Sequence, residues 1–183
     1  SGGHFERFEV YSSGAGVALT AGGTRALILP AGYLGAAFFG AALFYLTNTL
    51  PYPRVIAGVL GVWLIAFSVL FTDLLSTAFV VGIGTGIVMI ILSAKAPPDV
   101  ALILLNALAI LTGLNAVLDL VYLVNSSGAT LGTIRNDAAA FSAEIAPLIP
   151  AGVWAALWAL TALLMLGASI WYSLIRPRKI SRT

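Results

Sequence analysis

The chain has 183 residues, of which 60% are hydrophobic and only 9% are charged, and its mean hydropathy is +1.03. An ordinary water-soluble domain is excluded, because such a domain carries about 25% charged residues to keep its surface hydrated. The net charge is only +2, and most of the basic excess lies in the carboxyl-terminal tail, so we expect no nucleic-acid partner. There is no cysteine, which excludes disulfides, thiolate metal sites and a cysteine nucleophile.

Residues 1–25 differ from the rest of the chain. Apolar and polar residues partly alternate from His4 to Tyr11, and a second short apolar stretch, 17–20, lies between glycine-rich segments. Alternation with a period of two and glycine punctuation predict short strands, so we expect a β-hairpin or meander at the membrane surface. A lone hairpin is only marginally stable in water. We therefore expect the hairpin to be stabilised by contact with the membrane or with other parts of the protein.

Five apolar runs follow, each bounded by charges, prolines or polar clusters. They are 26–46, 55–71, 74–94, 100–124 and 152–175. A helix needs about 20 residues to cross a hydrocarbon core of about 30 Å, so the second run is marginal, and it forms either a tight hairpin or one broken helix with the third. We predict an all-α polytopic membrane protein with five transmembrane helices in residues 26–175. Close helix packing is expected at Gly82 and Gly86 of the third run.

The cations favour one orientation in the membrane. With five spans, six cations fall on one side and three on the other. The larger group is Arg54, Lys95, Arg176, Arg178, Lys179 and Arg182, and the smaller group is Arg7, Arg25 and Arg135. Because cytoplasmic flanks carry the excess of Lys and Arg, we expect a multi-pass integral membrane protein whose tail, 176–183, is cytoplasmic.

Asp119 is the single charge of the fourth run, and a charge inside a span is energetically costly. On a helix it shares one narrow stripe with Thr112, Asn115 and Tyr122, because these residues are three or four positions apart. Such a stripe must face protein or water. The carboxylate either binds a metal, a proton or a substrate, or it reaches the interface near the helix end or pairs with Asn115 and a neighbouring helix. The sequence leaves both interpretations open.

The loop 125–150 contains a predicted short helix. Asn136 and Asp137 are good N-cap residue types, and alanines follow them. Capping of this helix by Asp137 is the simpler interpretation of that residue. Glu144, seven residues further on, shares its face, but a catalytic pair of carboxylates is only weakly indicated, because nothing sets the separation of the two groups.

Three segments together resemble one protein family. Residues 22–35 read GGTRALILPAGYLG, residues 136–139 read NDAA, and residues 150–158 read PAGVWAALW. They are similar to the PAGYLG block, the acidic SDA loop and the Trp-rich last span of site-2-protease-like membrane zinc metallopeptidases of the B type. The resemblance covers nearly the whole chain, and the PAGYLG block is its most specific part.

Members of that family carry His-Glu-x-x-His on a helix, which supplies two zinc ligands and the general base. This sequence has a single histidine, His4, and no such motif. The resemblance therefore implies either a fragment of an intramembrane zinc peptidase that begins just after the catalytic helix, or an inactive relative. Zinc is the cofactor that the resemblance implies.

The family's third zinc ligand is an aspartate on a later membrane helix. By resemblance, Asp119 is the first candidate for it and Asp137 is the second. The strand region, 5–20, would present a membrane-protein substrate as an added strand. Substrate contacts are therefore expected in the strand region and beside Asp119. These candidates are Phe8, Val10, Val17, Leu19 and Asn115.

Two other functions stay open. The first is a non-catalytic multi-span protein, transporter-like or scaffold, in contact with membrane lipids, whose Asp119 carries a proton or an ion. The second is a pseudoenzyme that binds membrane clients through its strands without cutting them. Bound divalent metal in the full-length protein would favour the peptidase over the non-catalytic membrane protein.

Overall fold

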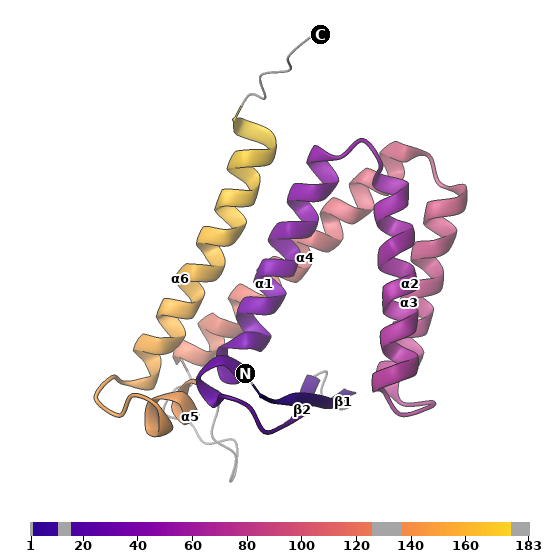
Figure 1. The fold of residues 1–183 in the computed structure, drawn as a ribbon. Helices are drawn as coiled ribbons and strands as arrows, with labels where there is room; N and C mark the ends of the chain where they lie inside the picture. Colours follow the sequence, from indigo (N-terminus) through magenta and orange to yellow (C-terminus); the bar gives the residue numbers. More distant parts are fainter. Residues whose placement is uncertain (1, 11–15, 126–136, 177–183) are drawn as a thin grey trace. The chain divides into compact units, whose positions relative to one another are not determined.

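The computed structural model describes residues 2–10, 16–125 and 137–176, and it consists of a small hairpin followed by helices (Figure 1). Five helical segments are long and apolar enough to cross a membrane, which confirms the predicted fold class and makes the chain an integral membrane protein. The elements are β1 (His4–Val10), β2 (Gly16–Ala21), α1 (Arg25–Thr49), α2 (Pro53–Phe71), α3 (Thr77–Lys95), α4 (Pro98–Asn125), α5 (Asp137–Glu144), α6 (Ala151–Ile170) and the π-helical turn η1 (Trp171–Ile175).

The chain divides into two compact units. Unit 1 comprises residues 1–24 and 51–104, and unit 2 comprises residues 25–50 and 105–183. The division falls within α4, between Leu104 and Leu105, so this helix contributes to both units. Each unit is therefore made of two separate stretches of the chain, and in unit 2 these are α1 and the part of the chain that follows Leu104.

In unit 1, α2 and α3 pack side by side as a hairpin of two helices (Figure 1). Small residues permit their close approach. A Cβ on Gly86 would lie 2.8 Å from the carbonyl oxygen of Gly61, and a Cβ on Gly82 would collide with the hydroxyl of Ser68. The predicted close packing at Gly82 and Gly86 is confirmed, and the second and third apolar runs form two helices rather than one broken helix.

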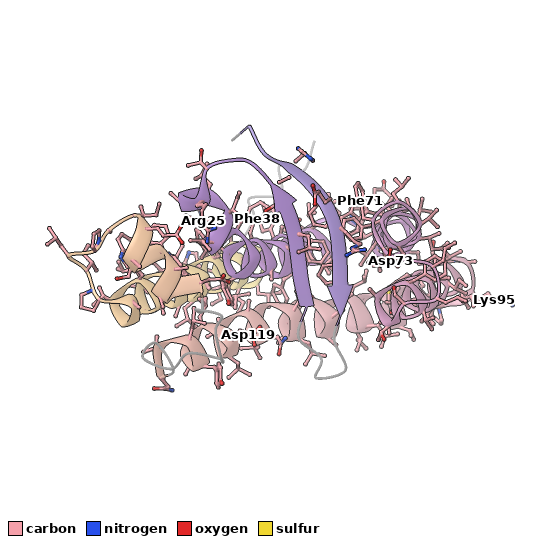
Figure 2. The ribbon with its side chains drawn as sticks, turned by 90° about the horizontal axis from the view of Figure 1, so that it is seen from below. Arg25, Phe38, Phe71, Asp73, Lys95 and Asp119 are labelled. Atoms are coloured by element: carbon pink, nitrogen blue, oxygen red, sulfur yellow. The ribbon has the colours of Figure 1, made fainter. Side chains whose placement is uncertain are left out.

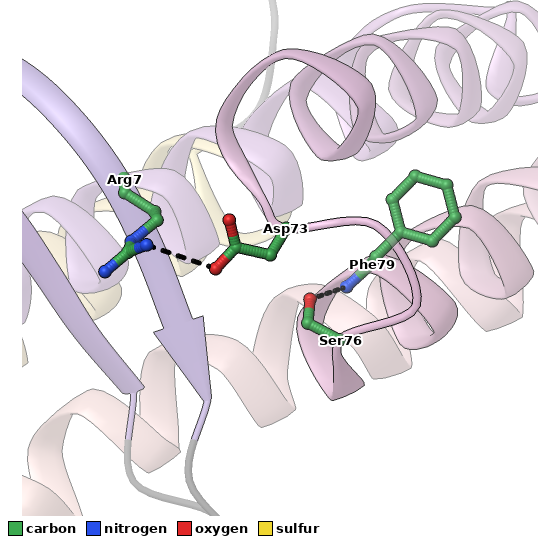
Figure 3. Close-up of polar contacts among 4 residues, drawn as sticks. All are labelled: Arg7, Asp73, Ser76 and Phe79. Atoms are coloured by element: carbon green, nitrogen blue, oxygen red, sulfur yellow. Dashed lines mark hydrogen bonds and ion pairs between the residues drawn. The ribbon is translucent and has the colours of Figure 1, made fainter.

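The turn between α2 and α3 is built by Asp73 and Ser76. The amide of Ser76 donates to the carbonyl oxygen of Asp73 at 3.0 Å, and its hydroxyl accepts from the amide of Phe79 at 3.2 Å and so caps α3 (Figure 3). Leu75 has a φ of 64°, a left-handed conformation that is uncommon outside glycine. Helix α3 consequently begins at Thr77, three residues after the start of the predicted apolar run 74–94. The reason is that the Ser76 cap, rather than hydropathy, determines where its first turn begins.

The two strands of unit 1 pair antiparallel, with Phe8 opposite Ala18, which confirms the predicted hairpin. The register shifts between Phe5 and Arg7, and such an irregularity changes the alternation of side chains along a strand. Phe5 and Phe8, three positions apart, therefore both reach α2. Their ring centroids lie 5.8 and 6.5 Å from that of Phe67.

In unit 2, α1 and α4 run antiparallel at very close range. A Cβ on Gly40 would lie 2.8 Å from both the carbonyl oxygen of Ala109 and the amide nitrogen of Gly113. Closer to the end of α1, the amide of Asn48 donates to Asn106 at 2.6 Å, and the amide of Asn106 donates back at 3.3 Å. This reciprocal pair satisfies polar groups that hydrocarbon would leave without partners, and it specifies the register of the two helices.

The core of unit 2 lies where α6 and α5 meet α1 and the second half of α4, and most of it is alanine. Its buried residues are Ala37, Ala116, Val117, Leu120, Leu123, Ala138, Phe141, Ala155, Trp158, Ala159 and Ala162. Small side chains let helix backbones approach closely, which matters in lipid because association there depends on packing rather than on the hydrophobic effect. The large aromatic members of the core are concentrated where α5 meets α6.

Candidate functional site

The short helix predicted in the loop 125–150 is α5, and it packs on the amino-terminal end of α6. The ring of Phe141 lies 4.7 Å from that of Trp154 and 5.4 Å from that of Trp158. The hydroxyl of Ser142 donates to the carbonyl oxygen of Ile149 at 2.7 Å, which ties α5 to the segment that enters α6. Aromatic packing and this hydrogen bond hold α5 at one end of the membrane-spanning helices of unit 2.

Two polar contacts join α5 to α1. Asp137, the first residue of α5, accepts a hydrogen bond from the hydroxyl of Tyr33, and Nε of Arg25 lies 2.6 Å from Oε2 of Glu144. Figure 2 shows Arg25 at the start of α1. Burial raises the pKa of Asp137, while the Tyr33 hydrogen bond and the charge of Arg25 act in the opposite direction. Asp137 is therefore a half-buried carboxylate held against α1.

Asp119 lies at the same level of unit 2 as Tyr33. Gly40 of α1 lies against Gly113 of the antiparallel α4, so seven residues back along α1 and six residues forward along α4 lead to Tyr33 and Asp119. In agreement with this register, the negative charge of Asp119 acts on the Tyr33 hydroxyl. Asp137 thus contacts the Tyr33 hydroxyl, and Asp119 lies at the same level of unit 2.

The surroundings of the two carboxylates differ. Asp119 is exposed on α4, as are Asn115 and Tyr122 of the same stripe, whereas Thr112 is half-buried. Asp119 lies six residues before the end of α4, which is about 9 Å along the helix axis. At that depth the carboxylate of Asp119 requires a polar partner or water. Asp137 has a polar partner in the Tyr33 hydroxyl.

Apart from Asn115, the candidate substrate-binding residues all lie in the hairpin of unit 1. Leu19 is 36% exposed on β2. Phe8 lies on β1 with its ring 6.5 Å from that of Phe67 of α2, so it packs within unit 1. Val10 and Val17 belong to the paired strands, and their side chains lie outside the described residues.

The described residues do not complete a zinc site. Nowhere in 2–10, 16–125 and 137–176 does a group of three His, Cys, Asp or Glu side chains gather closely enough to hold a metal ion. The one histidine of the sequence, His4, lies on β1 in unit 1, 3.7 Å from Glu6. Catalytic zinc sites use three protein ligands, so Asp119 and Asp137 offer at most part of one.

Two residues of this site are missing from the sequence-based candidates. Tyr33 lies within the PAGYLG block, and the specificity of that block was a signal that pointed to it. Its ring stacks on that of Trp158 at 6.4 Å. Nε1 of Trp154 is buried and has no acceptor among the described residues, which is the mark of a site that another polar group or a water completes. Trp154 lies in the PAGVWAALW segment that resembles the Trp-rich last span of the family, but that resemblance gives its indole no role.

One of the comparisons with known proteins identifies a family. The model of the Peptidase M50B-like family matches residues 1–169, which include the PAGYLG block and both candidate carboxylates. No curated protein matches the chain, and no solved structure matches it. Since the family model covers the hairpin, the first five helices and nearly all of α6, the chain belongs to the Peptidase M50B-like family of site-2-protease-like membrane peptidases.

Proposed function

We propose that this chain supplies one metal ligand and the substrate-handling part of an intramembrane zinc metallopeptidase that hydrolyses peptide bonds in or near the bilayer. Membership of the Peptidase M50B-like family supports the class of reaction. The sequence contains neither a second histidine nor His-Glu-x-x-His. The remaining zinc ligands and the general base would therefore come from a helix outside this sequence.

The observation that carries the proposal is the exposed carboxylate of Asp119 within a membrane-spanning helix. Together with the exposed side chains of Asn115 and Tyr122 it forms a polar stripe on α4. Polar groups at membrane depth face protein or a water-filled cavity, so this stripe is a suitable face for another polar helix. Asp137 is the weaker candidate for a ligand, because its carboxylate already accepts the hydrogen bond of Tyr33.

The residues of the chain then have separate roles. Zinc bound at such a site supplies an activated water for peptide hydrolysis. Asp119 would be the residue of this chain that holds the metal. Tyr33 and Asp137 keep α5 against α1 at the level of Asp119, and so maintain the geometry around that carboxylate.

Replacing the ligand carboxylate tests the proposal. Asp119→Asn keeps the shape of the side chain but removes its charge, so in the full-length protein we expect zinc content to fall from about one equivalent to almost none. The measurement is elemental analysis after dialysis. Asp99→Asn is the matched control, because Asp99 is an exposed acid in the first turn of the same helix, and its zinc content should equal that of the wild type.

Two results would contradict the proposal. Unchanged zinc in Asp119→Asn would remove this residue from the metal site. Absence of zinc from the wild-type full-length protein would instead favour the non-catalytic membrane protein, in which Asp119 carries a proton or an ion.

A further inference from the structure

We propose that the ends of α2, α3 and α4 in unit 1 form a binding site for an anionic membrane phospholipid, whose phosphate is bound by Arg54. None of the residues involved belongs to the proposed metal site, so the inference goes beyond the proposed function. Three observations carry it: a pocket lined by Arg54, the positive charge of that arginine, and an apolar face that continues from the pocket along α2.

A pocket of about 350 Å³ lies where the start of α2, the end of α3 and the start of α4 come together in unit 1 (Figure 1). It is lined by Tyr52, Arg54, Val55, Ser93 and three prolines. Pockets for small ligands have volumes of about 300–1,000 Å³, so this one has room for a headgroup. Because all three helices are long and apolar enough to cross a membrane, their ends lie at the level of the lipid headgroups.

Two hydrogen bonds hold the guanidinium of Arg54 at this pocket without neutralising its charge. Its Nε donates to the carbonyl oxygen of Ser93 at 2.8 Å, and its Nη2 donates to that of Ala94 at 2.6 Å. These carbonyls belong to the last turn of α3, where they have no acceptor role within the helix. Among the residues that the structure describes, Arg54 has no carboxylate partner and its remaining N–H groups have no acceptor. A guanidinium with free N–H groups matches the oxygens of a phosphate.

The other polar groups near the pocket also favour an anion. The segments 51–55 and 93–99 contain two cations, Arg54 and Lys95, and one acid, Asp99. Within the described part of the chain, Asp99 forms no ion pair with either cation. Tyr52, the N-cap of α2, makes no capping hydrogen bond with its side chain, so the first amides of this helix add to the attraction for an anion.

An apolar face leads from the pocket along α2. Val55 lines the pocket, and Val59 and Val62 follow it on the same face of the helix, because residues three or four positions apart are neighbours. The three valines are 60%, 65% and 60% exposed. In a helix that crosses the membrane, exposed valines contact the acyl chains of lipids. The pocket and this face therefore form one continuous surface that is polar at its end and apolar along its length.

The chemistry of this surface indicates the occupant. Arg54 provides a positive charge and N–H donors for a phosphate, and the valines provide apolar contacts for acyl chains. Free phosphate would use the first and leave the second uncovered. A phospholipid without net charge would bring a cation of its own close to Arg54 and Lys95. An anionic phospholipid satisfies both parts of the surface, so it is the ligand.

Lipid titration followed by native mass spectrometry tests the assignment in the full-length protein. The protein in detergent is titrated with dioleoyl phosphatidylglycerol and, separately, with dioleoyl phosphatidylcholine, which has the same acyl chains and no net charge. We expect the first phosphatidylglycerol to bind about tenfold more tightly than phosphatidylcholine. Equal binding of the two lipids overturns the proposal. Displacement of phosphatidylglycerol by an equal concentration of inorganic phosphate overturns it as well, because the site would then bind the anion without the lipid.

Two variants locate the lipid at the pocket. Arg54→Gln removes the charge, and we expect phosphatidylglycerol to bind about tenfold more weakly. Because Arg54 also ties α2 to α3, Val55→Glu tests the site without removing those bonds. It places a carboxylate at an exposed lining position in the first turn of α2, where an acid favours the helix but repels a phosphate, and it should weaken binding to a similar extent. Val55→Gln, of the same length and uncharged, is its matched control and should bind like the wild type.

A cation at the end of another helix controls for general attraction between the protein and anionic lipid. Arg176 is exposed and follows the π-helical turn η1 in unit 2, so Arg176→Gln should keep the wild-type affinity for phosphatidylglycerol. If Arg176→Gln loses as much affinity as Arg54→Gln, the lipid is attracted by net charge and not by the pocket, and the proposal is wrong. Equal affinities of Val55→Glu and Val55→Gln also exclude the pocket as the binding site.

Discussion

The tyrosine of the PAGYLG block connects three parts of unit 2 through one side chain. The hydroxyl of Tyr33 donates to Asp137 of α5, its ring stacks on Trp158 of α6, and the charge of Asp119 on α4 acts on it. None of the three partners adjoins Tyr33 in sequence. A single residue of α1 therefore contacts both α5 and α6.

Removal of the Tyr33 hydroxyl should loosen α5. In Tyr33→Phe the Asp137 carboxylate loses a donor while it remains half-buried, at a cost of about 1–3 kcal/mol. We expect faster amide hydrogen exchange over Asp137–Glu144 and unchanged exchange in α2 and α3. Tyr45→Phe is the control, because Tyr45 is an exposed tyrosine of the same helix. If α5 exchanges at the wild-type rate in Tyr33→Phe, the hydrogen bond does not hold it.

Among the elements, the crossing of α1 and α4 depends directly on the absence of a side chain at Gly40. At Gly40 an added Cβ would meet backbone atoms of α4 at 2.8 Å, whereas at Gly35 on the same helix it would meet no atom within 4 Å. Backbone atoms cannot move out of the way of an added Cβ as the end of a flexible side chain can. The two glycines thus form a matched pair for experiment.

Gly40→Ala should destabilise unit 2, and Gly35→Ala should not. We expect a loss of about 1–3 kcal/mol from overpacking at Gly40 and a neutral effect or a gain of up to about 1 kcal/mol at Gly35, where alanine favours the helix. Thermal unfolding in detergent, followed by circular dichroism, measures both. Similar unfolding midpoints for the two variants would mean that α1 and α4 are not in close contact.

The elements could be predicted from the sequence wherever one local signal dominated. Hydropathy found the five long helices, and period-two alternation with glycine punctuation found the hairpin. The start of α3 was missed by three residues, because Ser76 and the left-handed Leu75 end an apolar run that hydropathy alone would continue. The sequence indicates Asp119 and Asp137 as candidates, but it does not indicate that Tyr33 contacts Asp137 at the level of Asp119. The positions of these three residues relative to one another depend on the register of α1 against α4 and on the docking of α5. Neither of these produces a local pattern in the sequence.

For the whole molecule, the distribution of cations predicts the orientation in the membrane. The chain contains no cysteine, so a single introduced thiol can be labelled without ambiguity. In intact cells we expect a membrane-impermeant maleimide to leave Arg178→Cys unlabelled until the membrane is permeabilised, because the excess of cations on the side of the tail predicts that it is cytoplasmic. Thr24→Cys, an exposed position between β2 and α1, should be labelled at once. If Arg178→Cys were labelled in intact cells and Thr24→Cys were not, the predicted orientation would be wrong and the tail would lie outside the cytoplasm.

The discontinuity of unit 2 has a consequence for how the protein is made. The ribosome delivers α1 to the membrane before α4, α5 and α6 exist, whereas α2 and α3 emerge one after the other and can pair immediately. Until the second half of the chain arrives, Asn48 lacks the amide of Asn106 and Tyr33 lacks the carboxylate of Asp137. During biogenesis, Asn48 and Tyr33 of α1 therefore remain without these two partners until α4 and α5 have been synthesised.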